Sequence, residues 1–90
     1  MSAEAAVVKL DGELTMRTVA ASYGRALPQG DCVLDLGGVS EVDSSALALL
    51  LSWLRRARAS GVKLELRALP APLLALARLY GVDALLPIAA

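Results

Sequence analysis

The spacing of apolar residues along the chain alternates between the period of a strand and the period of a helix. Ala5–Leu10 and Cys32–Leu36 are short β-prone runs, and Val62–Leu66 alternates apolar and polar residues as half-buried strands do. Residues 15–27 and 46–60 instead carry apolar side chains at helical spacing. Because strands and helices alternate, the pattern predicts one α/β domain in which helices cover a mixed sheet.

Glycine and proline indicate where these elements end. Asp11-Gly12 is a turn signal after the first run, and Gly37-Gly38 is expected to break the strand before it. Gly61 is placed to end the long helix at its C′ position. Pro70 should open a third helix, which Gly81 ends.

The first helix is expected over Thr15–Leu27, with Thr15 as its candidate cap and Pro28 directly after it. The strand before it is short, so we expect that strand to be absent or frayed. The apolar face of this helix should consist of Met16, Val19, Tyr23 and Ala26.

The long helix has more leucine than one buried face needs. At about 100° per residue, one stripe suffices to seat the helix on the sheet. A second stripe, rotated by roughly a third of a turn, is interpreted as an exposed protein interface, because tryptophan often anchors such contacts. The alternative is that another helix covers the second stripe. The first stripe contains Leu47, Leu50, Leu51, Leu54 and Ala57, and the second contains Ala46, Leu49 and Trp53.

Charge and composition exclude several kinds of chemistry. The chain has nine basic and nine acidic residues and no histidine, which argues against nucleic acid as a partner and removes the commonest general base. Its one cysteine, Cys32, rules out an internal disulfide and a thiolate zinc site. We therefore expect no cofactor, no metal and no catalytic residue. The longest apolar run, Ala46–Leu51, is far shorter than a membrane span, and no signal peptide is evident, so we expect a cytoplasmic protein.

Asp43, Ser44 and Ser45 stand where a strand-to-loop segment becomes the long helix. Ser44 can be the helix N-cap, a phosphorylation site in the field of the helix N-terminus, or a nucleophile. The nucleophile reading is the weakest, because no histidine exists and no lysine is near in sequence to act as a base. Asp35, Glu41 and Asp43 are close in sequence, but no reaction class follows from them, and we expect Asp35 to be a partly buried, hydrogen-bonded acid.

The stretch VLDLGGVSEVDSSALALLLSWLRRARASGVKLEL, residues 33–66, resembles a STAS domain, the fold of the bacterial anti-sigma factor antagonists. It shares the buried strand that ends in Asp-Leu, the Val-Asp-Ser-Ser start of a long helix, and the glycine turn into another strand. Leu10–Leu14 resembles the entry to the family's first helix. The likeness covers about residues 7–88. It implies a single STAS domain over residues 1–90, with a four- to five-stranded mixed sheet and about three helices mainly on one side.

Within this family the likeness is closer to the MlaB-like subunits of the Mla phospholipid-transport ABC complex of Gram-negative bacteria. Val42–Ser44, Leu47–Leu51, Leu76–Val82 and Leu85–Pro87 carry it. The resemblance implies a non-catalytic subunit that binds an MlaF-like ATPase, and through it the permease, peripheral to the inner membrane. The expected partner-binding residues, including the second helix stripe, are Asp43, Ser44, Ser45, Leu47, Leu49, Trp53 and Tyr23.

The alternative function is an anti-sigma factor antagonist switched by phosphorylation of Ser44. The glycine usual after Asp-Ser-Ser is Ala46 here, and we expect its methyl group to obstruct a kinase that must approach closely. The spare leucines are also compatible with a weak homodimer, whereas neither nucleic-acid binding nor direct membrane insertion is expected.

Overall fold

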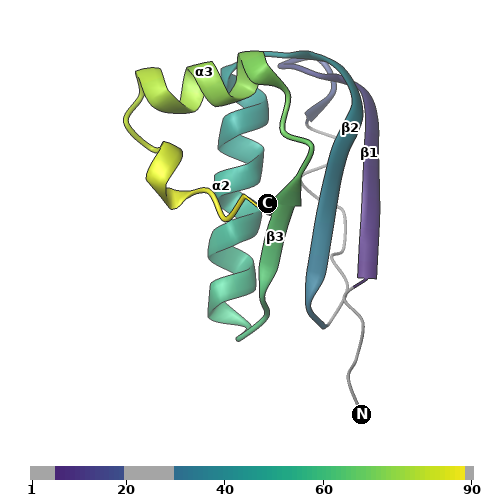
Figure 1. Cartoon of the computed structure of the whole chain (residues 1–90), viewed down its shortest axis with the longest axis vertical. Coiled ribbons are helices and arrows are strands. Elements are labelled where there is room, and N and C mark those ends of the chain that lie inside the picture. The colour runs from purple at the N-terminus through teal and green to yellow at the C-terminus, as the bar shows by residue number, and fades with distance from the viewer. Residues whose placement is uncertain (1–5, 20–29, 89–90) are drawn as a thin grey trace.

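The computed structural model describes residues 6–19 and 30–88, which form an α/β fold with parallel strands (Figure 1). The described strands lie in the order β1-β2-β3, and both neighbouring pairs are parallel. The elements in chain order are β1 (Ala6–Leu14), β2 (Cys32–Val42), α2 (Ser44–Ala59), β3 (Leu64–Arg67), α3 (Ala71–Leu79) and a 3-10 turn, η1 (Asp83–Leu85).

The α/β class predicted from the sequence is confirmed, but the described sheet differs from the expected one. It contains three parallel strands, where a mixed sheet of four or five was predicted. A further parallel bridge joins Leu66 to Ile88 beyond β3 without forming a longer strand. Two α-helices lie within the described residues, and most of the predicted helix Thr15–Leu27, with Tyr23, lies outside them.

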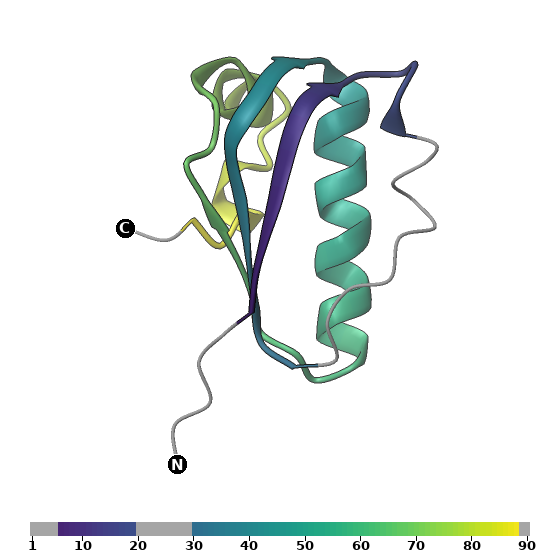
Figure 2. The ribbon, with the colours of Figure 1, turned by 90° about the vertical axis from the view of Figure 1, so that its right-hand side faces the viewer.

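The layers follow from the burial pattern of the strands. α2 covers one face of the sheet, as Figure 2 shows, and α3 packs against α2. Along β2, Leu34 and Leu36 are fully buried whereas Asp35 between them is half-buried, the alternation expected of a strand with one covered face. Asp35 accepts hydrogen bonds from the Gly37 amide (2.9 Å) and from Arg67 (3.3 Å), which confirms the expectation of a partly buried, hydrogen-bonded acid.

The predicted turn at Asp11-Gly12 is wrong, and β1 is neither absent nor frayed. The strand runs through both residues, and β2 has one extra residue at each of the two register shifts, between Lys9 and Asp11 and between Gly12 and Glu13. Gly12 has a φ of 76°, a conformation that suits a residue without Cβ. The residues read as a turn therefore lie within one long strand, opposite the irregular part of β2.

The predicted strand break at Gly37-Gly38 is also wrong, because β2 continues to Val42. The glycine at position 38 permits close approach of β1: a Cβ there would lie 2.9 Å from the Cβ of Asp11. Gly38 therefore marks a tight contact between the two strands, and β2 is long enough to carry the chain to the start of α2.

The helix phase of α2 is the main correction to the sequence analysis. Leu49 and Trp53, expected on an exposed interface, are both 0% exposed and belong to the hydrophobic core. Ala46, Leu50 and Ala57 are buried beside them, at the spacing of one helix face. Leu51 and Leu54, expected in the core, are only half-buried.

Local signals predicted the helix ends well. α2 ends at Ala59, and Gly61 follows with a φ of 71°, as expected for a C′ glycine. α3 has Pro72 in its first turn, and Gly81 after it also has a φ of 71°. Tyr80, which follows α3 directly, is exposed. None of the helices in the described part of the chain has the length and apolar content needed to cross a bilayer.

Candidate partner-binding site

The Asp43-Ser44 turn lies at the carboxyl edge of the sheet, beside the end of β1. Strand pairing sets this arrangement, because Leu14 is the register partner of Val42 in the parallel β1–β2 pair. The residues that follow each strand, Thr15-Met16 and Asp43-Ser44, therefore emerge next to each other. The Met16 amide and the Asp43 carboxylate, which are 27 residues apart in sequence, therefore meet at one edge of the sheet.

The carboxylate of Asp43 joins the two segments. Its Oδ1 accepts a hydrogen bond from the Ser45 amide (2.8 Å) and its Oδ2 accepts one from the Met16 amide (3.0 Å). Asp43 is therefore the N-cap of α2, and the prediction that Ser44 can cap the helix is wrong. The Met16 amide, and then the Ser45 amide, hold the pKa of Asp43 below its ordinary value of 3.8.

Ser44 occupies the first position of α2, with its side chain exposed. Its hydroxyl has no hydrogen bond to any described residue, so it is accessible to a binding partner or a modifying enzyme. The Ala46 side chain is fully buried. The expected obstruction of a kinase by this methyl group is therefore wrong, because the methyl group points away from the surface.

A dense set of hydrogen bonds braces the turn after β1. Glu13 binds Arg17 through two contacts, from Nη2 (2.9 Å) and Nε (3.1 Å), and also accepts from the Thr15 hydroxyl. The Thr18 hydroxyl donates to the Glu13 carbonyl oxygen at 2.7 Å. The Thr15 hydroxyl, and then Arg17, lower the pKa of Glu13 from its ordinary value of 4.5. These bonds fix the backbone that presents Met16 to Asp43.

Met16 is the surface residue that sequence reasoning missed. Helical spacing placed it on the buried face of the first helix, but its side chain is 76% exposed while Val19 is buried. It adds an exposed, adaptable apolar side chain to the segment whose Met16 amide binds Asp43. The available signal was its position directly after a strand that runs parallel to the one before Asp43.

The structure brings together only part of the predicted site. Asp43, Ser44 and Ser45 lie on the surface turn with Met16, whereas Leu47, Leu49 and Trp53 are buried in the core. Their burial argues against direct contact with a partner in this conformation.

Beside the end of β2, a hollow of about 390 Å³ extends toward the start of α3, lined by Val39, Ser40, Glu41, Val42, Pro70 and Pro72.

The candidate acids do not converge on a catalytic or metal centre. Asp35 is engaged by Gly37 and Arg67, which is a different set of partners from those of Asp43. No group of three or more acidic or cysteine side chains that could hold a metal ion occurs among residues 6–19 and 30–88. Cys32 is buried in the core.

Replacing Asp43 should matter more for stability than replacing Ser44. Asp43→Ala removes the cap of α2 and the bond to the Met16 amide, so we expect the Tm to fall by roughly 5 °C or more. Ser44→Ala should leave the Tm within about 2 °C, because its hydroxyl bonds no described residue. Thermal melts followed by circular dichroism test this; a larger loss in Ser44→Ala than in Asp43→Ala contradicts the assignment of the cap.

Acid should destabilise the fold through its paired carboxyls. Glu13, Asp35 and Asp43 all have lowered pKa values, so the unfolded chain binds protons at higher pH than the folded chain does. Their stabilising contribution is complete above about pH 5 and is lost as the pH falls through and below the ordinary values of 3.8 to 4.5. Melts at decreasing pH should show the Tm falling in this window, less steeply in Asp43→Asn. If the Tm of Asp43→Asn falls with pH as steeply as that of the wild type, Asp43 does not contribute to the acid sensitivity.

Fold and site together define a small α/β domain. At the carboxyl edge of its parallel sheet, the N-terminus of α2 is exposed and is held in place by hydrogen bonds. A family model described as "Mlab, STAS domain" matches residues 1–87, and the chain therefore belongs to this MlaB-like STAS family. A search of curated proteins found no match.

Proposed function

We propose that this chain is the non-catalytic STAS subunit of an ABC phospholipid transporter of the Mla type, which maintains outer-membrane lipid asymmetry. In this role it binds the cytoplasmic, MlaF-like ATPase, and through it the permease, and supports the activity of that ATPase. It would work in the cytoplasm, peripheral to the inner membrane through its partner. The observation that carries the proposal is the MlaB-like family match over nearly the whole chain.

The geometry of the Asp43–Ser44 turn supports docking through surface complementarity. Ser44 offers an exposed hydroxyl and Met16 an exposed apolar side chain. The two segments that carry them are held together by the hydrogen bonds of the Met16 and Ser45 amides to Asp43. A rigid surface loses little conformational freedom on binding, which favours association. The role assigned to the chain is to hold the ATPase in its productive arrangement, while the ATPase hydrolyses ATP.

Purification of the tagged chain from its native cell tests the proposal. We expect an ABC ATPase and its permease to be recovered with the wild-type chain and identified by mass spectrometry. Recovery of a serine kinase of the anti-sigma type, without any transporter subunit, would contradict it. Ser60→Ala, at the far end of α2, is a suitable control variant in this purification. Ala77→Ser is not suitable, because Ala77 is in the core.

Phosphorylation of Ser44, with the chain acting as an anti-sigma factor antagonist, is the second candidate function. The exposed hydroxyl at the first position of α2, which bonds no described residue, favours it, since a helix N-terminus stabilises negative charge. The adjacent Asp43 carboxylate opposes it by like-charge repulsion. Intact mass spectrometry of protein from resting and stressed cells distinguishes the two: a stoichiometric phosphoform at Ser44 supports the antagonist, and its absence supports the transporter subunit.

A further inference from the structure

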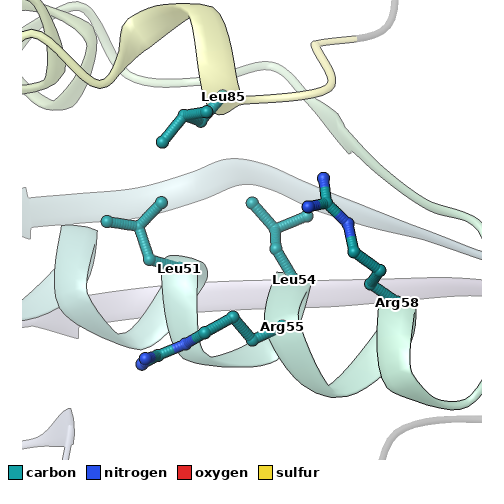
Figure 3. A pocket seen from close by; sticks show the side chains of 5 residues that line it. All are labelled: Leu51, Leu54, Arg55, Arg58 and Leu85. Atoms are coloured by element: carbon teal, nitrogen blue, oxygen red, sulfur yellow. The ribbon is translucent and has the colours of Figure 1, made fainter.

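A groove separate from the Asp43–Ser44 turn lies between α2 and η1. Leu51 and Leu54 line it from α2, Leu85 faces them from η1, and Arg55 and Arg58 flank the two helix leucines (Figure 3). Its volume is about 320 Å³. Leu85 is 62% exposed and the two helix leucines are half-buried, so the floor of the groove presents apolar surface to solvent.

The charge around this groove is positive and uncompensated. Neither the Arg55 nor the Arg58 side chain forms an ion pair or hydrogen bond with any residue of the described part of the chain. No acidic side chain lines the groove, nor the adjoining cavity of about 250 Å³ that shares Leu54, Arg58 and Leu85 with it. Because the whole chain has nine basic and nine acidic residues, this is a local surplus and does not follow from the composition.

We propose that this groove binds a short amphipathic segment of a protein partner, one that carries apolar side chains and at least one carboxylate. The leucines supply the apolar contact area, and the guanidinium groups of Arg55 and Arg58 offer paired donors that match a carboxylate. The proposal does not depend on which protein binds the Asp43–Ser44 turn.

The size of the groove limits the length of the segment. From Leu51 to Arg58 α2 rises about 10 Å, at 1.5 Å per residue, which corresponds to roughly two turns of a bound helix. An anchor pattern of apolar residues one turn apart, with an acid toward the Arg58 end, fits this spacing. Such a small contact surface predicts weak binding, in the micromolar range.

Selection from a random peptide library displayed on phage tests the chemistry directly. On the wild-type chain we expect enrichment of peptides with two apolar residues and an acidic residue within about two helical turns. Synthetic copies should bind about tenfold more weakly to Arg58→Glu and to Leu85→Asp. Leu85 is exposed, so its replacement should leave the fold intact, which circular dichroism checks.

Two matched variants control for general effects of charge. Arg78→Glu changes an arginine in the last turn of α3, and Leu79→Asp changes a leucine that is 75% exposed; neither residue lines the groove. Both should bind the selected peptides as the wild type does. The proposal is overturned if no peptides are enriched, if the enriched peptides lack acids, or if all four variants bind alike. Flotation with vesicles of anionic phospholipid that is lost in Arg58→Glu would also overturn it, in favour of a membrane.

Discussion

Replacing Trp53 with alanine is expected to destabilise the chain by about 3–5 kcal/mol, the usual cost of deleting a large aromatic side chain from a packed core. Trp53 is 0% exposed and packs in the core that α2 forms with the sheet. A domain of this size has a free energy of unfolding of roughly 5–13 kcal/mol, so the loss is a large part of the total. Urea denaturation gives the difference.

Two further variants make this prediction specific. Trp53→Phe should cost less, because the indole Nε1 has no hydrogen-bond partner to lose among the described residues and the ring volume is partly retained. Leu79→Ala, at an exposed position, should stay within about 0.5 kcal/mol of the wild type. If Trp53→Ala unfolds at the wild-type urea concentration but binds its partner poorly, Trp53 is an interface residue and the core assignment is wrong.

Replacing Ser44 with glutamate is expected to weaken binding to the ATPase proposed as the partner by about 10- to 100-fold, because a desolvated, unpaired charge in an interface costs several kcal/mol. The fold should remain intact, since an acidic residue is favourable in the first turn of a helix and Ser44 is exposed. The two effects separate a surface role from a structural one.

Ser60→Glu is the matched control for this variant. It places the same charge at the opposite end of the same helix, where the backbone of Ser60 makes the capping hydrogen bonds and its side chain is exposed. Titration of the ATPase by isothermal calorimetry should give wild-type affinity for Ser60→Glu. Equal affinities for Ser44→Glu and the wild type would place the docking surface elsewhere.

The sequence predicted those parts of the fold that local signals determine. The end of α2 follows from Gly61 and the start of α3 from its prolines, because such signals act within one turn. The start of α2 was located at the Asp-Ser-Ser motif, but its cap is Asp43 and not Ser44. The signals at Asp11-Gly12 and Gly37-Gly38 were misinterpreted, since both strands continue through them and Gly38 makes a close contact with a strand that is distant in sequence.

The phase of α2 could not be read from the sequence, because leucines surround much of the helix and several stripes are equally apolar. Packing against the sheet selects the face with Leu49, Leu50 and Trp53 and leaves Leu51 and Leu54 at the groove. The Asp-Ser-Ser motif located the candidate site. Met16 was missed because its contact with Asp43 depends on the register of β1 against β2.

Hydrogen–deuterium exchange of the chain with and without the proposed partner ATPase tests the central claim most directly, namely that the edge formed by Met16 and Ser44 is the docking surface. The account predicts slower exchange on binding in residues 15–19 and 44–48. Protection confined to the opposite sheet face around Lys9, Asp35 and Arg67, with no change at Ser44, would contradict it.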